Sequence, residues 1–502
     1  MNLFSQIRSA ISSPDKTFIE TGAGARITYA GMFARSAQIA SVLAGRGVKA
    51  GDRVAVQVEK TPENLLLYLA ALRAGAVYLP LNTAYTLAEL DYFIGDAEPS
   101  LIVCDPAKQA GLAEIAARRG VRAVETLDAA GKGSLTDAAL NAPQDFSDVA
   151  RGSGDLAAIL YTSGTTGRSK GAMLTHDNLT SNAKTLVDYW RFTGKDVLLH
   201  ALPVYHTHGL FVASNTVMLS GGSMIFLSKF DADEVMRLLP KATAMMGVPT
   251  FYTRLLKHPG LTKAACAHMR LFTSGSAPLL AETHIEFKAK SGHAILERYG
   301  MTETNMNTSN PYDGDRIAGT VGFPLPGVEL RIADPETGRP LPQGETGGIE
   351  VKGPNVFPGY WRMPDKTRAE FRDDGFFITG DVGKIDERGY VHIVGRAKDL
   401  IITGGFNVYP KEIESEIDAL PGVAESAVIG CPHPDFGEGV TAIIVCKPGV
   451  DLSEKAVIGV LEQRLAKFKL PKRVIFMDDL PRNTMGKVQK NVLRDAHAKL
   501  YG

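Results

Sequence analysis

Cysteine is scarce in this sequence, with four residues in a chain of 502. They are Cys104, Cys266, Cys431 and Cys446. These positions lie far apart, and no two of them have the close spacing of a metal-binding or redox pair. The sequence therefore favours reduced thiols in a reducing compartment, and we expect the four side chains to serve as packing residues.

The sequence also lacks an excess of either charge and any long apolar run. Lysine and arginine together number 55, as do aspartate and glutamate, so the formal net charge is zero. This balance does not indicate nucleic acid or an anionic membrane surface as a partner. No stretch of about 18 apolar residues occurs, and polar residues interrupt the N-terminal segment before a signal-like core could form. We expect a soluble, cytoplasmic protein that binds neither nucleic acid nor a membrane.

Short apolar runs alternate with helix-like segments along much of the chain. The runs 53–58 and 101–104 have the pattern of strands, and the segments 62–74 and 87–94 have the pattern of helices. This alternation predicts an α/β fold. The length suggests roughly three compact units, at about 150 residues for each.

Two later regions have a different pattern. The segments 326–333 and 348–353 predict short strands and turns, which is typical of a β-rich subdomain. From residue 408 the pattern predicts a helix with Pro410 in its first turn, followed by a strand from Val423. A smaller terminal unit is therefore expected to begin near Arg396.

The segment Tyr161–Gly171 is the most informative part of the sequence. It follows an apolar stretch, 157–160, that predicts a buried strand. Glycines allow backbone N–H groups to approach an anion, hydroxyls add donors, and Lys170 adds a mobile positive charge. The donors and glycines are Thr162, Ser163, Gly164, Thr165, Thr166 and Gly167. The spacing does not fit a Walker motif, so we predict a phosphate-binding loop of another kind, with a flexible surface loop as the alternative.

A second segment, Tyr299–Glu303, supplies what a nucleotide needs beyond a phosphate cradle. Tyr299 offers an aromatic face to a base, and Thr302 offers a hydroxyl to the α-phosphate. Glu303 offers a carboxylate to Mg²⁺, which binds oxygen ligands and bridges phosphate oxygens. Farther along, Asp381 is an acceptor suited to the two ribose hydroxyls, although alone it could be an ordinary turn aspartate.

Together these segments resemble the adenylate-forming superfamily of acyl-CoA synthetases, adenylation domains and luciferases. The resemblance covers essentially the whole chain, because the motifs occur in the family's order. They are 161–171, 202–206, 299–303, 349–360, 379–381, 395–405 and Lys487. Within the superfamily the sequence most resembles the malonyl-CoA synthetases, which join malonate to coenzyme A at the expense of ATP. The resemblance implies ATP and coenzyme A as co-substrates and Mg²⁺ as the cofactor, and malonate as the acid.

The resemblance also implies a fold and a division of labour. It predicts a large N-terminal domain, 1–397, of layered α/β subdomains with a β-rich subdomain, and a small mobile α+β domain, 398–502. In the first step the acid attacks the α-phosphate of ATP, and in the second the thiol attacks the acyl-AMP. Lys170, Thr302, Glu303 and Lys487 are the expected catalytic residues, with Lys487 serving the first step only.

Several expectations near the domain boundary also rest on the resemblance. Arg396 is expected to reach the ribose or phosphate, and Lys398 stands where the family has its hinge. A plain surface pair of Lys398 with Asp399 is the alternative. Gly404 and Gly405 are expected to border the tunnel of coenzyme A. Lys467 and Lys469 could meet its phosphates or could simply be solvated.

The choice of acid depends on Arg298, which directly precedes Tyr299. A guanidinium pairs in bidentate fashion with a carboxylate, so a dicarboxylate would satisfy it where a monocarboxylate would not. An ion pair with Glu297 or another acidic residue is the structural alternative. His206 and Ser276 are further candidates for binding the acid, although His206 could equally be a packing residue.

Some alternatives stay open at this level. Methylmalonate and malonate differ by one methyl group, and a stand-alone adenylation enzyme that loads a carrier protein would share every motif. A catalytically silent nucleotide-binding relative is a third possibility. Arg168 stands near the place of the family's proline and is a candidate for a phosphate contact or for solvent exposure. Acetylation of Lys487 by a lysine acetyltransferase is a further hypothesis, since it would neutralise that amine.

Overall fold

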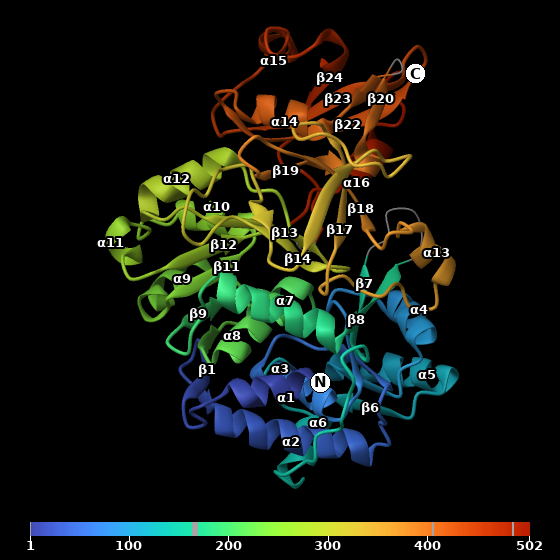
Figure 1. Cartoon of the computed structure of the whole chain (residues 1–502). Helices are drawn as coiled ribbons and strands as arrows, with labels where there is room; N and C mark the ends of the chain where they lie inside the picture. The colour runs from blue at the N-terminus through green and yellow to red at the C-terminus, as the bar shows by residue number, and fades with distance from the viewer. Residues whose placement is uncertain (1, 163–168, 404–405, 484–485) are drawn as a thin grey trace.

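The computed structural model describes residues 2–162, 169–403, 406–483 and 486–502. They form two mainly parallel sheets with helices around them, a small antiparallel sheet, and a C-terminal unit with its own sheet (Figure 1). This architecture confirms the predicted α/β class. Within these residues no helix has the length and apolar character needed to cross a membrane.

The first sheet has six strands in the order β6-β5-β3-β4-β7-β8. They are β3 (Arg53–Gln57), β4 (Val77–Pro80), β5 (Leu101–Cys104), β6 (Ala123–Thr126), β7 (Leu156–Thr162) and β8 (Lys170–Thr175). All pairs are parallel except β7 with β8, which form an antiparallel hairpin. Both faces of the inner strands are buried, which explains their continuous apolar sequence.

Helices cover the two faces of this sheet and form separate cores. On one face, α2 (Tyr29–Gly45), α3 (Pro62–Arg73) and α6 (Ser134–Leu140) pack with Val54 and Val56. On the other, α4 (Leu87–Ala97) and α5 (Gln109–Arg119) pack with Ala55. Alternate residues of β3 therefore contribute to different cores, as the two-residue period of a strand requires.

The second sheet has nine strands in the order β15-β14-β13-β12-β11-β9-β10-β1-β2. They are β1 (Thr17–Thr21), β2 (Arg26–Thr28), β9 (Val197–His200), β10 (Ser223–Phe226), β11 (Ala244–Gly247), β12 (Leu271–Ser274), β13 (Leu296–Met301), β14 (Asn305–Ser309) and β15 (Phe323–Pro324). Around it lie α1 (Leu3–Ala10), α7 (His176–Tyr189), α8 (Thr216–Ser220), α9 (Ala232–Leu238), α10 (Pro249–Leu256), α11 (Lys263–Cys266) and α12 (Ala281–Ser291). A π-helix, η2 (His208–Asn215), directly precedes α8.

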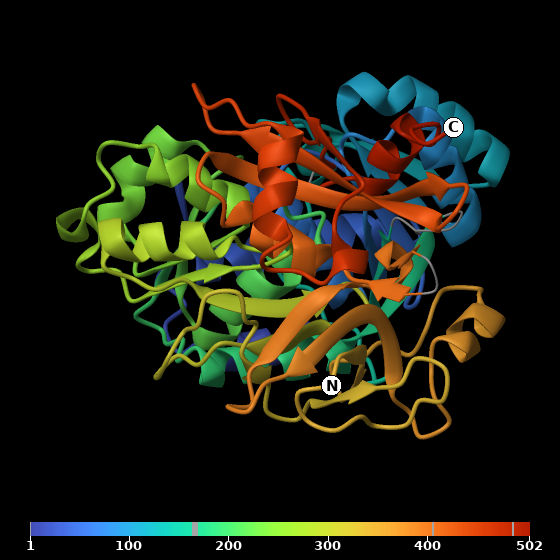
Figure 2. The same ribbon diagram turned by 90° about the horizontal axis from the view of Figure 1, so that it is seen from above.

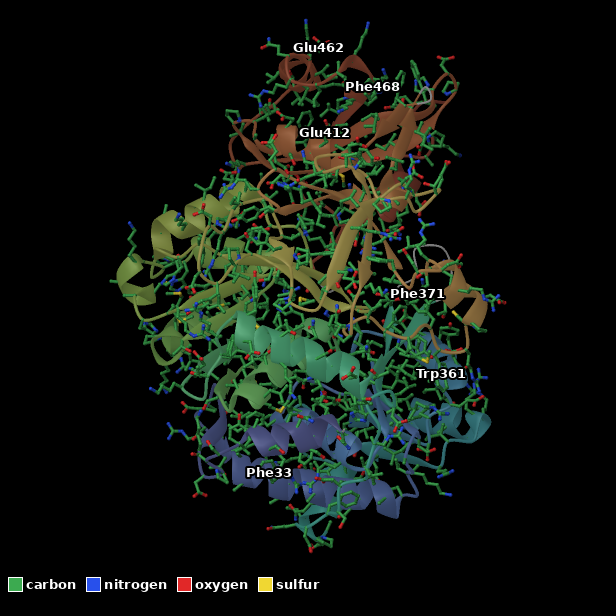
Figure 3. The ribbon with its side chains drawn as sticks, viewed as in Figure 1. Phe33, Trp361, Phe371, Glu412, Glu462 and Phe468 are labelled. Atoms are coloured by element: carbon green, nitrogen blue, oxygen red, sulfur yellow. The ribbon has the colours of Figure 1, made fainter. Side chains whose placement is uncertain are left out.

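The β-rich subdomain is a four-stranded antiparallel sheet in the order β16-β17-β18-β19. Its strands are β16 (Glu329–Ala333), β17 (Gly347–Lys352), β18 (Phe377–Ile385) and β19 (Val391–Arg396), with α13 (Pro364–Ala369) between the second and third. Trp361 and Phe371, on either side of α13, are labelled in Figure 3. The Trp361 amide donates to the Gly171 carbonyl at 2.7 Å, so this subdomain is tied to the hairpin of β7 and β8.

The C-terminal unit has its own sheet, helices and core. The strands are β20 (Ile401–Thr403), β21 (Phe406–Val408), β22 (Val423–His433), β23 (Gly437–Cys446) and β24 (Arg473–Phe476), and the helices are α14 (Pro410–Asp418), α15 (Glu454–Leu461) and α16 (Lys490–Ala496). Figures 1 and 2 show this unit above the junction of the N-terminal sheets. An ion pair of Lys447 with Glu282 on α12, at 2.8 Å, links it to the rest of the chain.

Candidate active site

The hairpin of β7 and β8 brings together the two ends of the predicted phosphate loop. Thr162 and Lys170 are paired across the two strands, and both are half-buried. The residues between them, which include the candidates Ser163, Gly164, Thr165, Thr166, Gly167 and Arg168, lie outside the described residues. The structure therefore fixes where the loop starts and ends.

Lys170 is held by two residues for which the sequence analysis gave no role. Its Nζ lies 3.0 Å from Oε1 of Glu370 and 4.1 Å from the centre of the Tyr360 ring. The Tyr360 hydroxyl lies 2.6 Å from Oε2 of Glu370 and 3.0 Å from Oε1 of Glu303. Lys170 and the candidate metal ligand Glu303 are thus connected through one tyrosine and one further carboxylate. Tyr360 falls within a motif of the resemblance, whereas the sequence around Glu370 carries no signal.

Glu303 lies in the turn between β13 and β14, directly after Thr302. Its side chain is buried, and burial raises the pKa of its carboxyl above the usual value. No cluster of three or more His, Cys, Asp or Glu side chains that could hold a metal occurs among residues 2–162, 169–403, 406–483 and 486–502. A single buried carboxylate suits Mg²⁺, which commonly takes one or two protein ligands and completes its shell with water and phosphate oxygens.

Tyr299, Asp381 and Arg396 form a second polar group. Asp381 on β18 is paired with Arg396 on β19, and the Arg396 Nε lies 2.6 Å from Oδ1 of Asp381. The Tyr299 hydroxyl donates to the other oxygen, Oδ2, at 2.5 Å. Burial and the neighbouring Asp381 raise the pKa of Tyr299, and Asp381 raises the pKa of Arg396. Asp381 is therefore a fixed acceptor with a positive neighbour, which is the chemistry that a vicinal diol requires.

Lys487 belongs to the C-terminal unit but lies at this site. Its backbone N–H donates to Oδ1 of Asn483 at 3.0 Å, and Gly486 takes a left-handed φ of 76° within the same turn. A Cβ on Gly486 would lie 3.3 Å from Thr250 on α10, so the turn rests against the N-terminal part of the chain. Part of the residue Lys487 is open to solvent, although many protein atoms surround its amine.

The electrostatic surroundings of Lys487 identify which groups it faces. The surrounding protein displaces water and lowers the pKa of its amine, and the positive charges of Arg396 and Arg298 lower it further. Asp381 and Glu303 act in the opposite direction and raise this pKa. Residues from both predicted domains therefore meet in one place.

Arg298 is a buried guanidinium without an acidic partner. Only 3% of the residue is exposed, and its Nε and Nη2 atoms have no hydrogen-bond partner. Among the described residues no ion pair involves it, and Glu297 lies 3.4 Å from Nδ1 of His284 instead. Burial lowers the pKa of Arg298 to about 9, so the group is still charged at neutral pH. The alternative of a structural ion pair between Arg298 and Glu297 is therefore wrong.

The Arg298 guanidinium lies against a glycine. A Cβ on Gly275 would stand 2.3 Å from Nη1 of Arg298, so the guanidinium keeps this place only because residue 275 has no side chain. The next residue, Ser276, has a φ of 70°, and its hydroxyl lies 3.3 Å from Nδ1 of His208. The turn after β12 therefore carries both the space for the guanidinium and the hydroxyl.

Two histidines complete this region. The His208 backbone N–H contacts Nδ1 of His206 at 3.4 Å. Burial, together with Lys487 and Arg298, lowers the pKa of His206 to about 3, so its ring is neutral. Burial and the positive charge of Arg298 also lower the pKa of His208, whose Nε2 has no hydrogen-bond partner. The sequence analysis missed His208, although a second histidine two residues after His206 was a visible signal.

The candidates near the domain boundary are only partly described. Lys398 is exposed in the short 3₁₀ segment Ala397–Asp399. Its neighbour Asp399 accepts a hydrogen bond from Arg494 of α16 at 2.9 Å. Gly404 and Gly405 lie outside the described residues. The hinge and the coenzyme A tunnel stay predictions.

Two family matches cover most of the chain. The AMP-binding enzyme family matches residues 8–361, and the AMP-binding enzyme C-terminal domain matches residues 412–487. The chain is 37% identical over 493 residues to a feruloyl-CoA synthase of an Amycolatopsis species, with 97% of each chain covered. It is 36% identical over 485 residues to a malonate–CoA ligase of Arabidopsis thaliana, covering 90% of this chain and 79% of the relative.

Similar solved structures include MatB from Rhodopseudomonas palustris. The crystal structure of its ATP-bound form is 68% identical in sequence, with a TM-score of 0.98, and covers 100% of this chain and 99% of that chain. The apo form of the same protein, with the same identity and coverage, has a TM-score of 0.88. The arrangement of this chain is therefore more similar to the ATP-bound form than to the apo form.

Proposed function

This chain belongs to the AMP-binding enzyme family and is an acid–thiol ligase of the acyl-CoA synthetase type, and we propose that its acid is malonate. The proposed products are malonyl-CoA, AMP and pyrophosphate. The observation that carries the choice of acid is the buried Arg298, which is charged and has no acidic partner among the described residues. Such a charge is costly unless a ligand supplies the counter-ion.

In the first proposed step, a malonate oxygen attacks the α-phosphorus of ATP, a new oxygen–phosphorus bond forms, and pyrophosphate leaves. One malonate carboxylate reacts while the other pairs with Arg298. Ser276, His206 and His208 lie close enough to this guanidinium to donate further hydrogen bonds to the acid. The buried Arg298 and His208 and the half-buried Ser276 and His206 then find partners in the substrate, which disfavours monocarboxylic acids.

The nucleotide is proposed to lie between the two polar groups described above. Asp381 accepts from the ribose hydroxyls, and Tyr299 lies against the base. Lys170 and Thr302 contact the phosphates, and Lys487 stabilises the negative charge that develops on them. Glu303 would hold Mg²⁺, which neutralises phosphate charge when bound.

In the second proposed step, the thiol of coenzyme A attacks the carbonyl carbon of malonyl-AMP. A carbon–sulfur bond forms, the carbon–oxygen bond to phosphate breaks, and AMP leaves. Lys487 is not needed here, because no pyrophosphate departs. The greater similarity to an ATP-bound relative and the position of Lys487 beside Asp381 and Glu303 support the view that the structure represents the first step.

A panel of acids tests the proposal. Pyrophosphate release and thioester formation are measured with malonate, methylmalonate, succinate, acetate, octanoate and ferulate, in the presence of ATP, Mg²⁺ and coenzyme A. We expect malonate to be preferred, with methylmalonate close behind, because one methyl group changes binding by only about 1–3 kcal/mol. A preference for ferulate or octanoate would contradict the proposal, and replacing coenzyme A with a carrier protein tests the acceptor.

Two further proposals concern the cell. We propose the cytoplasm as the location, and reversible acetylation of Lys487 as a way to block the first step. Incubation with an acetyl donor followed by mass spectrometry would show whether the amine is modified.

A further inference from the structure

The acid subsite includes the start of an unusual helix. The π-helix η2 begins at His208, one of the two histidines of the subsite. π-helices are rare, and they are found frequently at functional sites because they need support that an α-helix does not. The groups that support η2 therefore also determine where His208 lies.

Side chains support the first turn of η2 at the Gly209 carbonyl. This oxygen accepts from Nε2 of His200 at 2.9 Å and from the hydroxyl of Ser214 at 2.9 Å. Ser214 stands five residues after Gly209, so its hydroxyl closes the wider turn. A Cβ on Gly209 would lie 2.0 Å from the Pro203 carbonyl oxygen, so this close approach of the two backbone segments requires a glycine.

His200 is in turn held by a lysine from a distant part of the chain. The Lys60 Nζ lies 2.9 Å from Nδ1 of His200 and 2.8 Å from the His200 carbonyl oxygen. It also lies 4.2 Å from the centre of the Phe226 ring. Lys60 and His200 are both buried, and within the described part of the chain Lys60 forms no ion pair with a carboxylate.

The partners of the His200 ring fix where its proton lies. The Gly209 carbonyl can only accept, so the ring proton lies on Nε2, and Nδ1 accepts from the Lys60 amine, whose own pKa burial lowers well below its usual value. That proton is the one directed at the Gly209 carbonyl. Burial and the nearby Lys60 lower the pKa of His200 well below its usual value, which keeps the ring in this neutral form. A hydrogen-bonded path therefore runs from Lys60 through His200 to the first turn of η2.

We propose that Lys60 and His200 are positioning residues for the acid substrate. By fixing the tautomer of His200 they hold the Gly209 carbonyl, and with it the π-turn that places His208 beside Ser276 and Arg298. This proposal rests on the proposed location of the acid subsite but not on malonate being the acid. Neither residue contacts the nucleotide group formed by Tyr299 and Asp381, so their effect should be confined to the acid.

The test is Lys60→Met, which keeps the apolar stem and removes both hydrogen bonds. We expect KM for the acid to rise about tenfold, the equivalent of one or two lost hydrogen bonds, while KM for ATP stays unchanged. Lys60→Arg should restore much of the affinity, because a cavity of about 250 Å³ beside Lys60 leaves room for a larger donor. An equal change in both KM values, or no rescue by arginine, would overturn the positioning role.

A matched control is Lys16→Met. Lys16 also donates to two backbone carbonyls, those of Gly194 and Gly221. Gly221 follows the C-terminal end of α8, whereas η2 precedes its N-terminal end. The control is expected to leave KM for the acid unchanged. The same increase in the control as in Lys60→Met would overturn the proposal.

A second variant covers the case in which Lys60→Met does not fold. Ser214→Ala removes only the hydroxyl at the Gly209 carbonyl, and KM for the acid should rise by a smaller factor with KM for ATP unchanged. If Ser214→Ala changed neither KM for the acid nor KM for ATP, the proposed hydrogen-bonded path from Lys60 through His200 to the Gly209 carbonyl would be contradicted. All variants are measured with the acid that the wild-type enzyme prefers, so a preference for an acid other than malonate would refute the proposed function without affecting this test.

Discussion

Replacing Arg298 with methionine should make the empty protein more stable and nearly inactive toward malonate. Methionine is apolar and flexible, and it fills much of the same space without a charge. The empty protein gains because a buried guanidinium without a counter-ion is lost. The enzyme loses activity toward malonate because the second carboxylate of the substrate then has no partner.

The magnitude follows from the pKa of Arg298. Burial lowers this pKa from its usual value to about 9. At 1.36 kcal/mol per pKa unit, the difference places an upper limit of roughly 5 kcal/mol on the cost of keeping the charge. Relaxation of the protein reduces the measurable gain, and replacing a buried charge with an apolar residue has stabilised other proteins by about 1–4 kcal/mol. For catalysis, an unpaired substrate carboxylate should lower kcat/KM for malonate by a factor on the order of 10⁴.

The assay pairs denaturant unfolding without ligands with malonate-dependent pyrophosphate release. Arg73 is the matched control, because it is equally buried but its Nε lies 2.6 Å from Oδ1 of Asp148. Arg73→Met should destabilise the protein by about 3–5 kcal/mol, since it breaks the buried ion pair and leaves Asp148 with Arg8 alone, and it also removes the donor to the Phe33 and Phe146 carbonyls. If Arg298→Met destabilised the protein as strongly, or kept the wild-type kcat/KM for malonate, the reasoning about an unpaired charge would be refuted.

Three other predictions follow from the same geometry. Gly275→Ala should displace the Arg298 guanidinium, whose Nη1 lies 2.3 Å from the new Cβ, at little cost in stability because the end of a flexible side chain can move. The value of kcat/KM for malonate should fall. Adding Gly275→Ala to Arg298→Met should not lower kcat/KM any further. Lys487→Ala should abolish adenylate formation but still convert preformed malonyl-AMP to thioester, and equal damage to both steps would contradict the proposed role. Burial raises the pKa of Asp418 to about 6, above the 3.8 of an unperturbed aspartate, so the folded protein binds this proton more tightly and the group costs stability above that pH. Asp418→Asn should therefore increase the free energy of unfolding at pH 7.5 by at most about 3 kcal/mol, as measured by urea titration. It should also remove the part of the increase in this free energy that Asp418 causes as the pH falls from 7 to 4.

The sequence predicted the fold well where a pattern is local. The apolar run 157–160 lies within β7, and the segment 62–74 corresponds to α3, Pro62–Arg73. The helix with proline in its first turn is α14, Pro410–Asp418. The helix predicted over 87–94 continues to Ala97 and ends with Glu98 in a left-handed conformation, directly before Pro99.

The candidate site was predictable only for residues that lie in recognisable motifs. Tyr299, Glu303 and Asp381 belong to such motifs, and the structure brings them close to Lys487. The role of Glu370 was not predicted, because this residue stands among charged neighbours at the end of a short helix and lies 200 residues from its partner Lys170 in the sequence. Contacts of that kind depend on how separate sheets pack, and no local pattern encodes them.

One alternative could have been excluded from the sequence alone. An ion pair of Arg298 with Glu297 would join neighbours on a strand, and successive side chains of a strand point to opposite faces of the sheet. In β13 the Glu297 side chain accordingly contacts His284 of α12, while Arg298 faces Gly275. Because the two side chains point to opposite faces of the sheet, the counter-ion of Arg298 must come from a group other than Glu297. The described residues offer Arg298 none, and for this reason we propose that the acid substrate supplies the counter-ion.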